Sequence, residues 1–358
     1  MMHSIILLVL YLHSSAHALF PLQIPGLSKL NSISNKKSPF LILPGFGNSY
    51  LDYINPLGKG ENLGFATSLN NRGYICDVVK IERSDWLQIA GALTSKEFYS
   101  NTCRPHTLFR WYYDKVDQAV RELVQRTGEP VTLLGHSAGG WLARGILCDG
   151  RWKYDDTDDT EKRKSSNENQ PDITQASSDL VLGLITLGTP HYSPIGTMDM
   201  TRGAIKHVNL NYPGAYLANR NRNTIFQNKQ QENSSNNSNN RNTDVVSQPL
   251  FYMCIGGTAV IADAKAPKNS IGEFAYRSYK QVTGLDSTGT VGDGVVPLSE
   301  ALLEGADCNL VLPGVYHSIQ SENWYGGPAV VDRWLTQADT LAAATRALRV
   351  RYYREKDR

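Results

Sequence analysis

The chain of 358 residues is 41% hydrophobic and 20% charged, which suffices for one large α/β domain or two small ones. Its 36 basic and 34 acidic residues give a formal net charge of only +2, so nothing indicates the clustered basic face of a nucleic-acid-binding protein, and we expect no nucleic-acid partner. Five widely spaced cysteines include no C-x-x-C pair, which supports neither a zinc site nor a thioredoxin-type motif, and we expect no metal or other cofactor.

The N-terminus has the pattern of a targeting leader. Residues 5–12 form an apolar run too short to span a bilayer, and Ala16-His17-Ala18 is a small-x-small cleavage pattern, although no Lys or Arg precedes the run. We interpret residues 1–18 as a signal peptide. Residues 19–38 are free of acidic residues and rich in serine, as transit peptides are. This two-part leader is similar to that of algae with complex plastids and predicts plastid residence, with secretion or the ER lumen as the alternative.

Short apolar segments alternate with amphipathic ones along the rest of the chain. Helical spacing of apolar residues runs through 111–127 and stops at Gly128, and a long helix begins near Pro328. Such alternation indicates an α/β domain with a mostly parallel sheet covered by helices on both faces. The expected strands are at 40–43, 74–81, 131–134, 180–187, 250–255 and 309–312.

Two polar segments interrupt this pattern, at about 151–179 and 219–243. Neither contains enough apolar surface to offset the entropy of ordering, so we predict that both are disordered insertions. They follow predicted elements at points where loops can lengthen without cutting the sheet. The domain is therefore expected to span residues 39–349, with a basic tail at 350–358.

The segment Gly135-His136-Ser137-Ala138-Gly139 has the form G-x-S-x-G and follows an apolar run. A sharp strand-to-helix turn here would lift the Ser137 hydroxyl out of the sheet, and the glycines would remove side chains that clash in so tight a bend. Ser137 is therefore the candidate nucleophile, with an ordinary serine in a glycine-rich turn as the alternative. The side chain of His136 is expected to point elsewhere and to have a structural role.

A serine hydroxyl needs a base to accept its proton, most often a histidine that a carboxylate holds in one tautomer. On the fold that typically carries this motif, the chain order is serine, acid, histidine. His317 follows the last predicted strand, at the edge where an open α/β sheet carries its chemistry. It is the candidate base, and His191 and His207 are the alternatives.

The candidate acid lies in the segment before this histidine. Asp293 stands between two glycines that permit an unusual backbone path. A simple Gly-Asp-Gly turn is the alternative interpretation. Asp286 is the nearest competitor, and Asp307 is too close to the last strand to be a good candidate.

An oxyanion hole needs two N–H donors. The amide of Ala138, directly after the nucleophile, would be one of them. The second should come from the loop after the first core strand, Pro44-Gly45-Phe46-Gly47. We assign it to the amide of Phe46, with a glycine turn of no special role as the alternative.

Seven short motifs occur in order along the chain. They are Leu43-Pro44-Gly45-Phe46-Gly47-Asn48, Asp85-Trp86-Leu87, Gly135-His136-Ser137-Ala138-Gly139-Gly140-Trp141-Leu142-Ala143-Arg144, Leu187-Gly188-Thr189-Pro190-His191, Tyr279-Lys280-Gln281-Val282, Gly292-Asp293-Gly294-Val295-Val296-Pro297 and Gly314-Val315-Tyr316-His317-Ser318. Together they make the chain, over residues 39–340, similar to the lipase-like α/β-hydrolases of plants, algae and cyanobacteria. More distantly, the chain resembles lecithin-cholesterol acyltransferase-like lipases and the GPI inositol-deacylase domain.

The resemblance implies the α/β-hydrolase fold, a Ser137–Asp293–His317 triad and plastid residence. It also implies an acyl ester or lipid substrate, which the strand end at Leu187–His191 favours. The chain departs from many lipases at Pro44, where a histidine usually precedes the oxyanion glycine. This departure bears on the assignment of the donor at Phe46.

These inferences predict a serine ester hydrolase that works through an acyl-enzyme. An acyltransferase with the same triad and a hydrolase-fold binding protein without turnover are the alternatives. Residues 191–248 are the expected cap, and loose membrane contact by this cap is a further expectation. Its apolar side chains either receive an acyl chain or pack the cap onto the core. They include Ile195, Met198, Met200 and Tyr212.

Overall fold

A central sheet of parallel strands organises the molecule in the computed structural model. The structure describes residues 37–58, 60–147, 180–192, 194–195, 199–211 and 249–356. The leader up to residue 36, both predicted insertions and most of the expected cap lie outside the described residues. Each of the five strand pairs in this central sheet is parallel, which confirms the predicted sheet type. In spatial order the six strands are β2 (Cys76–Val78), β1 (Phe40–Leu43), β3 (Val131–His136), β4 (Val181–Leu187), β5 (Phe251–Thr258) and β8 (Cys308–Pro313).

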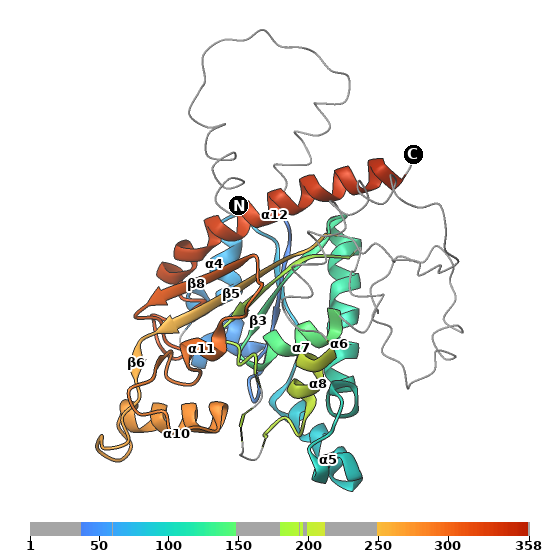
Figure 1. Ribbon diagram of the computed structural model, residues 1–358. Coiled ribbons are helices and arrows are strands. Elements are labelled where there is room, and N and C mark those ends of the chain that lie inside the picture. The colour runs from blue at the N-terminus through green and yellow to red at the C-terminus, as the bar shows by residue number, and fades with distance from the viewer. Residues whose placement is uncertain are drawn as a thin grey trace, which may run out of the picture. The chain divides into compact units, whose positions relative to one another are not determined.

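Side chains of the strands alternate between two apolar cores, one on each face of the sheet. On β1, Leu41 and Leu43 belong to one core, whereas Phe40 and Ile42 belong to the other. Helices cover both faces because a parallel sheet buried on both sides needs apolar partners on both sides. The first face carries α6 (Pro105–Thr127) and α7 (Ala138–Leu147), and the second carries α4 (Phe65–Asn70) and α12 (Pro328–Lys356) (Figure 1).

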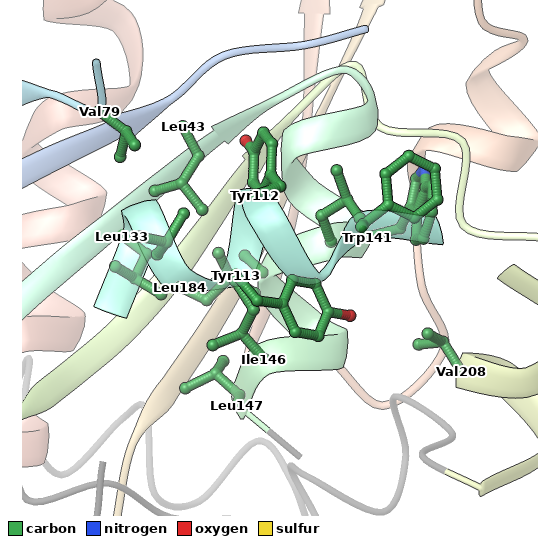
Figure 2. Packing of buried hydrophobic residues seen from close by; sticks show 14 of the residues in the cluster. Leu43, Val79, Tyr112, Tyr113, Leu133, Trp141, Ile146, Leu147, Leu184 and Val208 are labelled. Atoms are coloured by element: carbon green, nitrogen blue, oxygen red, sulfur yellow. The ribbon is translucent and has the colours of Figure 1, made fainter. Parts of the chain in front are cut away.

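The core of the first face is built around aromatic side chains. Tyr112 and Tyr113 of α6 and Trp141 of α7 belong to the same buried cluster as strand residues such as Leu43 and Leu133 (Figure 2). Each of these side chains is at most 2% exposed. Burial of one large apolar side chain stabilises the fold by roughly 1.5–3 kcal/mol, so helix α7 is held firmly at its position.

The helices and strands differ from the predicted ranges mainly at their ends. The strand predicted at 74–81 is shorter, because the chain turns away from the sheet where Ile81 N–H donates to Val79 O. Helix α6 starts earlier than predicted, with Pro105 in its first turn, and ends before Gly128, which has a φ of 67°. Helix α12 continues to Lys356, through the residues assigned to the basic tail.

The remaining elements surround the C-terminal ends of the strands or connect them. Among the described residues, no helix is long and apolar enough to cross a membrane. These elements are α3 (Leu51–Ile54), η1 (Pro56–Gly58), η2 (Glu61–Leu63), η3 (Arg83–Thr94), α5 (Lys96–Ser100), α8 (Ala204–Asn211), β6 (Val260–Ile261), α10 (Ile271–Thr283), β7 (Val291–Gly292) and α11 (Leu298–Ala301).

Candidate active site

Ser137 occupies a sharp turn between β3 and α7. Its φ of 53° lies in the left-handed region, which costs energy for a residue with a Cβ and is a mark of functional turns. The neighbouring strand holds the turn, because Ser137 N–H donates to Leu187 O at 2.9 Å and the Thr189 hydroxyl donates to Ser137 O at 2.9 Å. The Ser137 side chain is partly exposed at the end of the sheet.

The glycines of the motif have the steric role that the sequence predicts. A Cβ at Gly135 would lie 2.4 Å from the Cα of Gly140. A Cβ at Gly139 would lie 2.3 Å from the carbonyl oxygen of Leu43. Both distances are far inside van der Waals contact, so α7 packs against β3 and β1 only because these two positions lack side chains.

Asp293 and His317 form a buried hydrogen-bonded pair. His317 Nδ1 is 2.8 Å from Asp293 Oδ2, and the two residues are also joined by a backbone bond of 2.9 Å from His317 N to Asp293 O. Asp293 Oδ1 accepts from the amides of Val295 and Val296 at 3.0 and 2.7 Å. Gly294, with a φ of 100°, permits the tight turn that aims these amides at the carboxylate.

The strand ends bring this pair to the same edge of the sheet as Ser137. The ring of His136, the residue before Ser137, is centred 4.8 Å from the ring of His317. Gly188 follows β4, and a Cβ there would lie 2.4 Å from Asp293 Oδ2. The serine, the histidine and the acid that the sequence singles out therefore gather at the carboxyl edge of the sheet, where parallel α/β sheets carry their sites.

The loop after β1 lies directly against the serine. A Cβ at Gly45 would be 2.8 Å from the Cβ of Ser137. The amide of Gly45 is already used, because it donates to the Tyr53 hydroxyl at 2.9 Å. Within the described part of the chain, the amides of Phe46 and Ala138 donate to no protein group, so both remain available to an oxygen of a bound molecule.

The ring of Phe46 is 59% exposed and packs on Trp86, with the ring centroids 5.0 Å apart. Trp86 in turn donates through Nε1 to Asn48 O at 2.9 Å. This contact explains the Asp85-Trp86-Leu87 motif, whose tryptophan fixes the loop that carries the predicted second donor.

The alternative bases have other surroundings. His191 is fully buried, and its ring nitrogens contact Arg144 Nη1 at 3.3 Å and Thr186 Oγ1 at 3.2 Å. Burial, reinforced by Arg144, holds the pKa of His191 well below its usual range. His207 is half-buried on α8, and burial also lowers its pKa.

The alternative acids are also engaged elsewhere or exposed. The carboxylate of Asp307 accepts from the amide of Tyr252 at 2.8 Å and so fixes the start of β5. Asp286 lies on an exposed loop, where its Oδ1 accepts from the amide of Thr288.

Two residues of the site have no local signal in the sequence. The Tyr325 hydroxyl donates to Asp293 Oδ2 at 2.8 Å and accepts from Gly257 N–H at 2.8 Å. Burial and the nearby carboxylate hold the pKa of Tyr325 well above its usual range, so the hydroxyl keeps its proton. The other residue is Tyr53, whose hydroxyl contacts His136.

His136 is buried and hydrogen-bonded within the protein, as expected for a structural role. Its ring lies under the His317 loop, with Nε2 3.2 Å from His317 O and Nδ1 2.9 Å from the Tyr53 hydroxyl. The residue ends β3, and its ring is held by these two contacts.

No protein-family profile matches the chain, and no curated protein matches it. Among solved structures, it is similar to the mature form of the Bacillus licheniformis lipase BlEst2, with 13% identity and a TM-score of 0.44 over 89% of this chain and 95% of that one. It is also similar to EstA from Clostridium botulinum, with 14% identity and a TM-score of 0.41 over 91% and 92% of the two chains. A soluble variant of monoglyceride lipase from Saccharomyces cerevisiae has 13% identity and a TM-score of 0.35 over 87% and 89%.

The chain has the α/β-hydrolase fold. Its parallel sheet with helices on both faces, and the strained serine between β3 and α7, are the defining features.

Proposed function

We propose that this protein is a serine ester hydrolase in which Ser137 is the nucleophile, His317 the general base and Asp293 the acid that orients the base. One observation carries the proposal. A buried carboxylate holds His317 Nδ1 at 2.8 Å, at the same edge of the sheet as a serine that has a φ of 53°. Nucleophilic catalysis by serine uses this combination.

In the first half of the reaction, Ser137 Oγ attacks the ester carbonyl carbon and His317 Nε2 accepts the hydroxyl proton. The carbonyl π-bond pair moves onto oxygen and gives a tetrahedral oxyanion. When the intermediate collapses, the bond to the leaving alkoxy group breaks and His317 returns the proton to it. In the second half, water attacks the acyl-enzyme with His317 again as base, which releases the acid and restores Ser137.

The oxyanion would be held by the amides of Phe46 and Ala138. Both amides are free of protein acceptors in the described part of the chain, and Ala138 is the first residue of α7, so the helix N-terminus also favours negative charge there. Loss of one such donor typically costs about 3 kcal/mol of transition-state stabilisation.

Lipid esters are the substrate class that we propose, as the motif resemblance to lipase-like hydrolases implies. In the described part of the expected cap, Ile195 and Met200 are 63% and 64% exposed and could contact an acyl chain or a lipid surface. Met198 and Tyr212 lie outside the described residues. A panel of lipid classes offered to the purified protein tests this proposal, and hydrolysis of water-soluble short esters alone would contradict it.

A fluorophosphonate probe tests the catalytic assignment directly. The wild-type chain is expected to be labelled, and Ser137→Ala is expected to abolish both the labelling and ester hydrolysis. Labelling that persists in Ser137→Ala would place the nucleophile elsewhere. Analysis of products in the presence of an alcohol acceptor also separates hydrolysis from acyl transfer, because a transferase yields the new ester instead of the free acid.

We also propose plastid residence through the leader at residues 1–38. A fluorescent fusion to residues 1–45 is expected to accumulate in the plastid of an alga with complex plastids. Appearance of the fusion in the medium would contradict this destination.

A further inference from the structure

Two buried side chains lie between the loops that the proposed reaction uses. Tyr53 of α3 is fully buried, and His136, the last residue of β3, is 1% exposed. The Tyr53 hydroxyl is 2.9 Å from His136 Nδ1, and His136 Nε2 is 3.2 Å from the backbone oxygen of His317. A continuous hydrogen-bonded link therefore runs from α3 to the loop of the catalytic histidine.

The proton positions in this link follow from the chemistry of the partners. The carbonyl oxygen of His317 can only accept, so His136 Nε2 carries a proton and donates it. Burial, with a further contribution from His317, holds the pKa of His136 well below its usual range, so the ring is neutral. Nδ1 is then unprotonated and accepts from the Tyr53 hydroxyl.

With its proton directed at His136, the Tyr53 oxygen accepts from the oxyanion loop. Gly45 N–H donates to it at 2.9 Å, and the side-chain amide of Asn48 donates at 3.2 Å. Burial also raises the pKa of Tyr53 well above its usual value, so the hydroxyl stays protonated. Every donor and acceptor of this buried group has a partner, which is the condition for a rigid polar network.

We propose that Tyr53 and His136 are positioning residues that hold the oxyanion loop and the His317 loop at a fixed separation. The inference rests on the proposed function, because it concerns the same active site. Gly45 directly precedes the proposed donor Phe46, and His317 is the proposed base, so the link connects the two groups that must act on one carbonyl. The link itself transfers no proton during the reaction.

The Tyr53→Phe variant removes one oxygen and leaves the ring in place. We expect kcat for p-nitrophenyl butyrate to fall about 10- to 100-fold, with KM nearly unchanged, because the loss falls on transition-state geometry. Affinity for a trifluoromethyl ketone should fall by a similar factor, since its serine adduct carries an oxyanion. A merely structural role would not move kcat and this affinity together.

Matched variants separate positioning from general damage to the fold. His136→Leu should lose as much activity as Tyr53→Phe, whereas His136→Gln should recover part of it, because its amide can still donate to His317 O. Tyr74→Phe is the control, since Tyr74 is a buried tyrosine whose hydroxyl binds Asp339 of α12, away from the site. It should leave kcat unchanged.

The tautomer of His136 gives a test that depends on neither a variant nor activity. In ¹⁵N spectra of the wild-type chain at neutral pH, Nε2 should be protonated and Nδ1 unprotonated. A proton on Nδ1, or wild-type kcat in both Tyr53→Phe and His136→Leu, would overturn the inference while leaving Ser137-dependent hydrolysis intact. Absence of any Ser137-dependent reaction would instead overturn the proposed function, whatever the spectrum shows.

Discussion

The acid end and the oxyanion end of the candidate site are built in opposite ways. Asp293 is 2% exposed, and four donors converge on its two carboxylate oxygens, from His317, Tyr325, Val295 and Val296. At the other end, the Phe46 ring is 59% exposed and its amide donates to no described protein group. The carboxylate that only other protein groups touch is therefore saturated with internal donors, whereas the amides that would meet the substrate have no protein acceptor among the described residues.

The largest loss of activity should come from replacing the Asp293 carboxylate, on which the four donors converge. Asp293→Asn places an amide where His317 Nδ1 and the Tyr325 hydroxyl both need an acceptor, which favours the wrong imidazole tautomer. We expect kcat to fall about 10⁴-fold, as for the equivalent change in other triads. Steady-state ester hydrolysis measures the loss, and Asp286→Asn, on an exposed loop, is the control that should keep wild-type activity. An Asp293→Asn enzyme of near-normal kcat would exclude Asp293 from the triad.

The next largest loss of kcat should come from adding a side chain at Gly45, in the loop that carries the Phe46 amide. A Cβ at Gly45 would lie 2.8 Å from Ser137 Cβ and 3.0 Å from His136 O, so Gly45→Ala must displace the loop that carries the Phe46 amide. We expect a loss of about 10²- to 10³-fold in kcat, the cost of one oxyanion donor. Gly91→Ala is the matched control, because a Cβ there meets no atom within 4 Å. Equal rates for the two variants would show that the loop takes no part in catalysis.

Removing one of the four donors to the Asp293 carboxylate should lower the activity less. Tyr325→Phe deletes a single hydroxyl, and the carboxylate of Asp293 keeps its other three donors. We expect a decrease of about 10-fold in kcat/KM, the worth of one hydrogen bond to a charged group. The measurement is the steady-state kcat/KM of Tyr325→Phe, compared with that of Asp293→Asn. A loss as large as that of Asp293→Asn would mean that the carboxylate depends on the Tyr325 hydroxyl alone and not on its four donors together.

The smallest effect is on stability, and it comes from His191, which lies outside the candidate triad. The pKa of His191 is lowered in the folded state by burial and by Arg144, so below about pH 6.5 the unfolded chain binds a proton that the folded chain does not. The free energy of unfolding should therefore fall as the pH drops, with a limiting slope of about 1.4 kcal/mol per pH unit from this group. Urea unfolding at about pH 7.5 and 5.5 should show a weaker decline for His191→Gln. An identical decline in both proteins would contradict the assignment.

The sequence predicts the sheet and the three site residues because each has a strong local signal. Strands buried on both faces must be apolar throughout, and the bend at Ser137 and the turn at Asp293 both require glycines beside them. The Tyr325 and Tyr53 contacts have no such signal. They join residues 32 and 83 positions apart and depend on how separate elements pack. The partners of His136 are equally distant in sequence, since they come from α3 and from the loop after β8.

The order of the strands also has a consequence for biosynthesis. The site draws on the loop at residues 44–48, near the start of the domain, and on residues up to Tyr325, near its end. The strand β8 at the sheet edge is the last to be translated, and the His317 loop comes after it. A nascent chain therefore contains Ser137 before Asp293 and His317 have been made, so the candidate site can assemble only after β8 and the loop that follows it have joined the sheet.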